Sequence, residues 1–275
     1  MTTLVVGAGA MGRWVAQTVP GDVAFADTDP AAAEAAAATV GGRAVALDTD
    51  ETFEAVCLAV PMTVVAQAIA DHAGTAEQAI YDVTGEMATP VEAMREHAPD
   101  LERVSFHPLF APENAPGNVP VVADSPGPVT DAVREAMTDA GNDVFETTVA
   151  EHDEAMRSVQ AKAHAAILAY GLAADEVDDR FHTPVSAVLD DLVGQVTGGE
   201  EHVYASIQRV FGGAAEVADA ASRIAAAAGD HDEQPDEYSD AFAALYREAG
   251  RAHHDSDIAQ ATDRDTTDET DESPE

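Results

Sequence analysis

The sequence is short of cysteines, and this shortage excludes several classes of protein. Cys57 is the only cysteine among 275 residues, so no disulfide framework and no cysteine-based zinc site can form. Its apolar neighbours are typical of a buried strand rather than of a nucleophile. No apolar run approaches the roughly 18 residues of a membrane-spanning helix, and no signal peptide precedes the first predicted strand. We therefore expect a cytoplasmic protein.

Basic residues are also scarce. The chain has 13 lysines and arginines against 52 aspartates and glutamates, and its formal net charge is -39. Phosphate backbones and anionic lipids would repel such a chain, so we expect neither a nucleic-acid nor a membrane partner. The acids are spread over the whole sequence, which is typical of proteins from salt-in halophilic archaea, where molar salt screens the self-repulsion. The alternative is an ordinary acidic protein with one acidic tail.

The first half of the chain alternates short apolar runs with helical stretches such as 30–40 and 62–73. Aromatic residues are only 5% of the chain, so alanine fills much of the predicted core and favours closely packed helices. This βαβ rhythm predicts a parallel sheet covered by helices on both faces. The predicted strands are 4–7, 23–27, 44–47, 55–60, 79–83, 104–107, 119–123 and 144–147.

Strand patterns stop near residue 150. Four helices are predicted after this point: 151–176, 183–197, 201–229 and 236–251. From residue 253 the chain is almost entirely Asp, Thr, Glu and Ser, a composition that cannot offset the entropy of ordering. We therefore predict a dinucleotide-binding domain over 1–150, a helical domain over 151–252 and a disordered acidic tail over 253–275.

The motif Gly7-Ala-Gly-Ala-Met-Gly12 directly follows the first predicted strand and opens a helix. In this context Gly7 permits a tight turn, Gly9 lets the backbone approach a pyrophosphate, and Gly12 lets the helix pack on the strand. The backbone of Ala10 and Met11 would then face the phosphates from the helix N-terminus. The sequence thus predicts a Rossmann-type doubly wound domain, although a glycine-rich turn without a cofactor has the same pattern.

Asp27 ends the second predicted strand, twenty residues after Gly7, where such domains place the acid that binds the adenosine ribose hydroxyls. Asp29 follows it and no arginine does, so a 2′-phosphate would meet two carboxylates. We expect NAD in preference to NADP. Val60 and Pro61 end the fourth strand, beside the expected nicotinamide ribose, unless they form only a strand-to-helix turn.

His107 stands out among the ten histidines because it ends an apolar strand and precedes Pro108, which holds it in an extended conformation. A dehydrogenase that oxidises an alcohol needs a base for the hydroxyl proton, and a neutral imidazole suits that role near pH 7. The competing interpretation is a histidine that only packs in the core.

Two motifs resemble those of the prephenate dehydrogenase family, the prephenate and arogenate dehydrogenases of tyrosine biosynthesis. Ser105-Phe-His-Pro-Leu-Phe-Ala-Pro112 is similar to the family's His-Pro-Met-Phe-Gly-Pro motif. The stretch from His152-Asp153 to His164 is similar to its His-Asp…His helix, with the same spacing of 12. The stretch from Thr183 to Gln208 resembles the family's archaeal helical domain, and together these matches cover most of residues 3–215.

The resemblance implies an all-helical dimerisation domain like the C-terminal domain of 6-phosphogluconate dehydrogenase, and hence a homodimer. It also implies oxidative decarboxylation of prephenate or arogenate, with His107 as the base that takes the proton of the ring hydroxyl. Hydride passes to NAD, and loss of the ring carboxylate as CO2 makes the ring aromatic. No metal is required.

This sequence departs from the family pattern at two positions. Gly85 stands where the family often has a serine that assists the substrate hydroxyl, with Thr84 beside it. Gln195 replaces an arginine that binds the substrate carboxylate, so Arg157 or Arg209 would have to substitute, unless the substrate differs.

The predicted helix that begins at residue 151 carries a polar stripe at the spacing of one helix face. The stripe could line the cleft between the domains, with Arg157, Gln160 and His164 contacting the substrate, or it could be a solvated face. Two other functions stay open: a β-hydroxyacid or imine dehydrogenase that uses Lys162, the only lysine, and a catalytically degenerate NAD-binding protein.

Overall fold

The computed structural model describes residues 1–199, 201–228 and 240–251. The predicted tail over 253–275 lies outside these residues, as does the start of the predicted helix 236–251. The contacts group the chain into two compact units, residues 1–213 and the residues from Ala214 onward. The last described strand ends at Glu146, but the first unit also includes the helices that follow it. The predicted domain boundary at residue 150 therefore stays a prediction.

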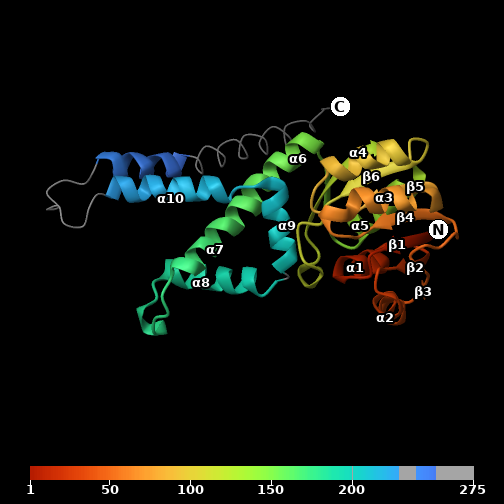
Figure 1. Ribbon diagram of the computed structural model, residues 1–275, viewed down its shortest axis with the longest axis horizontal. Coiled ribbons are helices and arrows are strands. Elements are labelled where there is room, and N and C mark those ends of the chain that lie inside the picture. The colour runs from red at the N-terminus through yellow and green to blue at the C-terminus, as the bar shows by residue number, and fades with distance from the viewer. Residues whose placement is uncertain (200, 229–239, 252–275) are drawn as a thin grey trace, which may run out of the picture. The chain divides into compact units, whose positions relative to one another are not determined.

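Eight strands form one sheet in the order β3-β2-β1-β4-β5-β6-β7-β8 (Figure 1). β1 to β6 are parallel, whereas β7 is antiparallel to β6, and β8 is parallel to β7. The predicted parallel sheet is thus confirmed for six strands and wrong for β7 and β8, which run in the opposite direction. The bounds are β1 (Thr2–Val6), β2 (Asp22–Ala26), β3 (Arg43–Ala44), β4 (Phe53–Leu58), β5 (Ala76–Asp82), β6 (Glu102–Phe106), β7 (Asn118–Ser125) and β8 (Asp143–Glu146).

Helices cover both faces of the sheet because successive strand residues point to opposite sides. Val5 of β1 packs in a core with α1, α2 and α5, whereas its neighbours Leu4 and Val6 pack in a second core with α3 and α4. Full burial of one such side chain contributes roughly 1.5–3 kcal/mol. Cys57 is fully buried, as predicted. These helices are α1 (Ala10–Thr18), α2 (Pro30–Val40), α3 (Val65–His72), α4 (Ala88–His97) and α5 (Pro128–Asp139).

Four short helical segments punctuate the chain: η1 (Met62–Val64), η2 (Ala73–Thr75), η3 (Pro112–Asn114) and η5 (Asp179–Phe181). The strand order from β3 to β6 is that of a doubly wound nucleotide-binding sheet, whose ligands bind at the carboxyl ends of the strands where the order reverses. Here that point lies between β1 and β4. The predicted Rossmann-type fold is confirmed.

All the described secondary structure after β8 is helical. The helices are α6 (Val149–Met156), α7 (Ala163–Ala173), α8 (Pro184–Thr197), α9 (Glu201–Phe211) and α10 (Ala214–Ala228). A π-helix, η4 (Arg157–Lys162), joins α6 to α7, so the predicted helix 151–176 is not one regular α-helix. The predicted helix 201–229 is also wrong as a single element, because Gly212 and Gly213 have φ values of 71° and 106° and end α9. None of the described helices is long and apolar enough to cross a membrane.

Candidate active site

The glycine motif forms a tight loop between β1 and α1. Gly7 has a φ of 100°, and a Cβ atom there would lie 2.2 Å from the carbonyl oxygen of Ala59. A Cβ at Gly12 would lie 1.9 Å from the carbonyl oxygen of Gly7. Both contacts require glycine, which is the predicted role of these two positions. A Cβ at Gly9, in contrast, would meet no atom within 4 Å, so the backbone there is open to a ligand.

The loop brings the remaining predicted cofactor residues to the same edge of the sheet. Gly9 is the N-cap of α1 and no side chain caps it, so the amide groups of Ala10 and Met11 begin the helix facing that open space. Val60 borders Gly7, with its Cγ1 atom 3.3 Å from the position of a Cβ there, and Pro61 precedes η1. These residues fit the diphosphate and nicotinamide ends of a dinucleotide.

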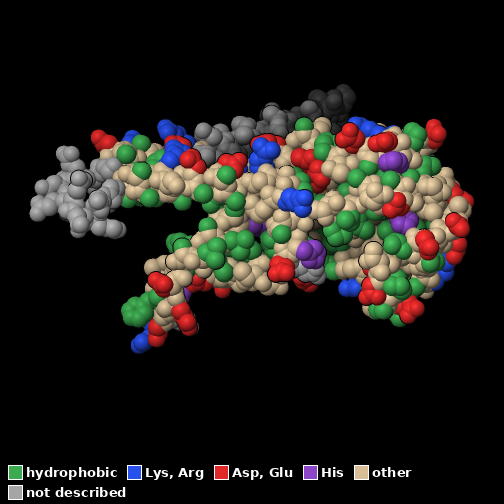
Figure 2. All heavy atoms as spheres, in the orientation of Figure 1, with side chains coloured by type: hydrophobic (Ala, Val, Ile, Leu, Met, Phe, Trp, Pro, Cys, Tyr) green, Lys and Arg blue, Asp and Glu red, His purple; other side chains and the backbone are tan. Residues whose placement is uncertain are grey.

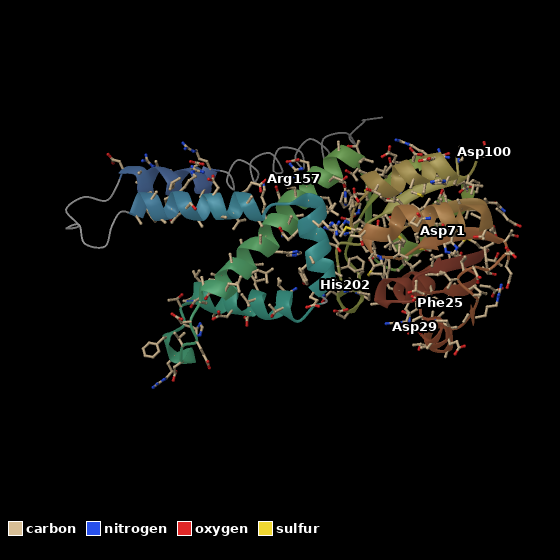
Figure 3. The ribbon with its side chains drawn as sticks, in the orientation of Figure 1. Phe25, Asp29, Asp71, Asp100, Arg157 and His202 are labelled. Carbon is tan, nitrogen blue, oxygen red and sulfur yellow. The ribbon has the colours of Figure 1, made fainter. Side chains whose placement is uncertain are left out.

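Asp27 is half-buried at the end of β2 and already supports the loop. Its Oδ2 atom accepts a hydrogen bond from the amide of Ala8 at 2.7 Å, and its Oδ1 atom accepts one from the amide of Asp29 at 2.9 Å. A carboxylate has roughly four acceptor sites, so it can still bind ribose hydroxyls. The side chain of Asp29 caps α2 by accepting from the amide of Ala31 (Asp29 is labelled in Figure 3).

One arginine lies closer to this loop than the sequence indicated. The guanidinium of Arg13 donates to the carbonyl oxygen of Ala8 at 2.8 Å, so Ala8 is held from both sides, by Arg13 and by Asp27. The expectation that no arginine is near Asp27 was based on the residues that follow it in sequence. Arg13 reaches the loop from the first turn of α1 instead.

His107 lies just beyond β6 and is buried. Its amide donates to the carbonyl oxygen of Pro120, and its Nδ1 atom lies 2.9 Å from Nε2 of His152, at the middle of α6. The Nδ1 atom of His152 lies 2.7 Å from Oδ1 of Asp153, which also accepts from the amide of Met87 at 3.3 Å. Two segments distant in sequence thus form one chain of hydrogen bonds.

The carboxylate of Asp153 determines the tautomers along this chain. A carboxylate only accepts hydrogen bonds, so Nδ1 of His152 carries the proton and Nε2 of a neutral His152 accepts. His107 must then donate from Nδ1, which leaves a lone pair on its Nε2. That Nε2 atom lies 3.6 Å from the position of a Cβ on Gly85. On the side that faces Gly85, His107 therefore presents an unprotonated nitrogen that can accept a proton, as a general base must.

Burial lowers the pKa of His107 to about 3, and the neighbouring His152 adds to the shift. The unfolded chain, with a histidine pKa of roughly 6.5, therefore binds more protons than the folded chain below that pH. We expect the free energy of unfolding to fall as the pH drops from about 7.5 to about 5, and to fall less in His107→Asn. Denaturant melts of both proteins at these pH values measure the difference; equal slopes would contradict a neutral buried His107.

Thr84 and Gly85 differ in where their atoms point. The Thr84 hydroxyl is buried and donates to Oδ2 of Asp82 at 2.5 Å, so it faces the protein interior rather than the open side of His107. Burial raises the pKa of Asp82 to about 7 against these hydrogen bonds from Thr84. Gly85 does face His107, and the Sδ atom of Met62 lies 3.0 Å from its Cβ position. Of the two predicted substrate contacts, the structure brings only Gly85 to the base.

The predicted substrate residues of the helical region also differ in their exposure. Arg157 begins the π-helix with its side chain 48% exposed and only a distant ion pair to Glu154 (Arg157 is labelled in Figure 3). Gln195 on α8 and Arg209 on α9 are exposed, and Lys162 is half-buried. The predicted stripe of Asp153, Arg157, Gln160 and His164 on one α-helical face is wrong, because the π-helix changes the rotation per residue between Asp153 and His164.

Gln160 and His164 do turn toward the interior. The ring of His164 packs edge-on against Tyr204 of α9 with 4.8 Å between centroids, and burial lowers the pKa of His164. The Oε1 atom of Gln160 and the Nδ1 atom of His164 are buried and have no hydrogen-bond partner within the described part of the chain. Among those residues no group of three or more His, Cys, Asp or Glu side chains is arranged to hold a metal ion.

No protein-family model matches the chain. Over 269 residues the chain is 33% identical to the 4-amino-4-deoxyprephenate dehydrogenase of Streptomyces pristinaespiralis, and the match covers 89% of this chain and 88% of that protein. The chain belongs to the prephenate/arogenate dehydrogenase family. It is therefore an NAD-dependent dehydrogenase.

Solved structures of this family have the same fold. The prephenate dehydrogenase of A. aeolicus, in complex with hydroxyphenyl propionate and NAD+, superposes with a TM-score of 0.67 at 14% identity and covers 98% of both chains. The arogenate dehydrogenase of Synechocystis superposes with a TM-score of 0.58 at 16% identity, over 94% of this chain and 100% of that one. At such identities the likeness concerns the fold.

Within the family's His-Asp motif, the part played by His152 and Asp153 was not predicted. The predicted substrate contact was His164, at the other end of the motif; His152 was given no role, and Asp153 was only placed in the polar stripe. A signal did exist in the histidine followed directly by an acid, since an adjacent carboxylate commonly fixes a histidine tautomer. The pairing of His152 with His107 has no local signal, because 45 residues separate them.

Proposed function

We propose that this enzyme catalyses the NAD-dependent oxidative decarboxylation of prephenate or arogenate, which yields 4-hydroxyphenylpyruvate or tyrosine. The observation that carries the proposal is the lone pair on Nε2 of His107, held toward Gly85 by the chain through His152 to Asp153. Family membership supplies the substrate class. The His-Pro motif favours this reaction over a lysine-dependent β-hydroxyacid or imine dehydrogenase.

In this mechanism Nε2 of His107 accepts the proton of the ring hydroxyl as the carbon beneath it loses hydride. Bound NAD supplies the hydride acceptor. Nδ1–H of His107 continues to donate to Nε2 of His152, whose own Nδ1 donates to the Asp153 carboxylate, so the ring keeps its orientation as it takes the proton. The carbon–carbon bond to the ring carboxylate then breaks, its electron pair completes the aromatic ring, and CO2 leaves. General-base assistance of this kind is worth roughly 10²–10⁴-fold in rate.

A second candidate substrate is the keto acid 4-amino-4-deoxyprephenate, on which the Streptomyces relative is named to act. Two observations favour it. Gly85 places no hydroxyl beside His107, and Nε2 of His107 only accepts hydrogen bonds, so it can receive an N–H as well as an O–H. Assaying NADH formation and products with prephenate, arogenate and 4-amino-4-deoxyprephenate separates these functions. Turnover of none of the three would favour the degenerate NAD-binding protein.

The cofactor preference depends on Asp27. Its carboxylate would repel the 2′-phosphate of NADP, and Asp29 adds a second negative charge nearby. We expect kcat/KM to be higher with NAD than with NADP, and Asp27→Ser to reduce that preference. Because Asp27 also accepts from the amide of Ala8, serine is the suitable replacement, since it retains an acceptor at that position. A wild-type preference for NADP would mean that Asp27 has been assigned wrongly and that Arg13 is the next residue to test.

A homodimer through the helical region is part of the proposal. α7 has no buried residue although nearly all its residues are apolar, and several large side chains of α7, η5 and α8 are open to solvent: Leu172 is 89% exposed, Phe181 74% and Val185 71%. Hydrophobic side chains lie along these helices in Figure 2. A second copy would cover them. Light scattering at high salt should give twice the chain mass, and Val185→Asp should reduce it; a monomeric wild type would contradict the dimer.

The acidic composition supports two further parts of the proposal, a halophilic host and a cytoplasmic location. A net charge of -39 destabilises the folded state through repulsion between its acids, unless salt screens that repulsion. The single cysteine suits a reducing compartment. Thermal stability measured from low to molar KCl tests the first of these, since a protein as stable at low salt as at molar salt is not adapted to a salt-in cytoplasm.

A further inference from the structure

Gln208 of α9 makes a contact that fixes the direction of its amide. Its Nε2 atom donates to the carbonyl oxygen of Ala161 in the π-helix at 2.6 Å. A carbonyl oxygen only accepts, so the nitrogen of the amide must face Ala161 and its oxygen must face the other way. That Oε1 atom is buried and has no hydrogen-bond partner among the described residues. Gln208 therefore offers a buried acceptor with a known orientation.

The surroundings of Gln208 belong to the candidate substrate site. Tyr204 lies one helical turn earlier on α9 and packs on His164, and Gln160 precedes Ala161 and has a second buried acceptor without a partner in the described residues. Next to this group, Ile207 and Phe211 pack with Ala161 and Met156, and Met62 packs against them. Met62 also borders Gly85, which faces His107. The contact between α9 and the π-helix thus adjoins the catalytic base.

This group is poor in positive charge. The guanidinium groups of Arg157 and Arg209 are exposed, Lys162 next to Ala161 is half-buried, and Gln195 is uncharged. Prephenate carries two carboxylates and a keto group, which only accepts hydrogen bonds. Arogenate carries an ammonium group in place of the keto group. Its net charge is therefore less negative by one, and it has three N–H donors that prephenate lacks. A buried acceptor in a site without buried guanidinium groups is complementary to the ammonium.

We infer that Gln208 is a specificity-determining residue whose Oε1 atom accepts a hydrogen bond from a substrate ammonium group, so the substrate is an amino acid of the arogenate type rather than a keto acid. The inference rests on the proposed function and deepens it. A hydrogen bond to a charged group discriminates by roughly 10- to 100-fold against a ligand that lacks the donor.

The test uses binding as well as turnover. Tyrosine and 4-hydroxyphenylpyruvate differ at the same group as the two substrates, so calorimetry of each with the NAD-bound protein measures the preference without catalysis. We expect tyrosine to bind roughly 10- to 100-fold more tightly, and arogenate to have the higher kcat/KM by a similar factor. Equal or tighter binding of 4-hydroxyphenylpyruvate would overturn the inference. If tyrosine binds more tightly but neither arogenate nor prephenate is turned over, the result would instead count against the proposed function.

Two variants test the residue itself. Gln208→Lys keeps a donor for the carbonyl of Ala161 but replaces the acceptor by a positive charge, so it should abolish or reverse the preference for tyrosine. Gln208→Met removes both polar atoms at similar length and should abolish the preference without reversing it, which covers the case that the lysine variant does not fold. Gln78→Lys, at an exposed position of β5, is the matched control. An unchanged preference in folded Gln208→Met would overturn the assignment.

Discussion

Replacing His107 by asparagine should lower kcat by roughly 10²–10⁴-fold and leave NAD binding nearly unchanged. Asparagine can still bind the substrate hydroxyl but cannot take its proton. The cofactor is held elsewhere, by the loop from Gly7 to Gly12 and by Asp27. Stopped-flow or steady-state turnover, NAD titration and thermal melts on the same preparation give the three quantities needed.

The competing interpretation of His107 is a packing residue. In that case His107→Asn would lose stability and NAD affinity together, and activity per folded molecule would survive. His97→Asn is the matched control, because His97 is an exposed histidine of α4. Near-normal turnover in folded His107→Asn would end the proposed mechanism, and His164 would become the next candidate for the base.

Replacing His152 by phenylalanine should lower kcat by roughly 10- to 100-fold, because His107 would then have a buried Nδ1–H without an acceptor, at a cost of roughly 1–3 kcal/mol. The ring volume is retained, but nothing selects the tautomer that leaves Nε2 of His107 unprotonated. His152 does not face the open side of His107, so it is a positioning residue. Its replacement should lower kcat more than it raises KM.

Asp153→Asn separates tautomer control from charge. The Oδ1 atom of asparagine can still accept from Nδ1 of His152 and from the amide of Met87, so the tautomers survive while the negative charge is lost. We expect a smaller fall in kcat than in His152→Phe. The pH profile of kcat/KM supplies a second readout. Loss of the His152 ring or of the Asp153 charge should change the pH at which His107 titrates, whereas a purely structural role would leave the profile unchanged. Equal activity of His152→Phe and wild type would show that His107 needs no tautomer control.

Much of the nucleotide-binding half could be predicted because its signals are local. The apolar runs between turns located all eight strands, and the positions of Gly7 and Gly12 follow from a loop too tight for a Cβ atom. Only α1 and β2 separate the glycine loop from Asp27, so the relation between the two is preserved in their spacing along the sequence. β3 was the weakest prediction, two residues long instead of four, because an edge strand pairs on one side only.

The helical half was predicted less well, because its geometry depends on contacts between helices. Nothing in the composition of 151–176 signals a π-helix, and this element moved Arg157 to an exposed position and turned Gln160 inward. The break at Gly212-Gly213 did have a sequence signal. It was outweighed by the alanine-rich residues that follow it, whose high helix propensity suggested one continuous helix.

The sequence by itself determined where the strands and the dinucleotide loop lie, and it singled out His107 as the candidate base, since each of these depends on residues that are neighbours along the chain or that carry a motif. Only the tertiary structure decided which side chains surround that base. It pairs His107 with His152 across 45 residues, and it turns the Thr84 hydroxyl onto Asp82, away from the substrate side. A hydrogen bond depends on distances of about 3 Å and on the direction of a donor, and these are set by how the helices pack on the sheet, which no spacing in the sequence records.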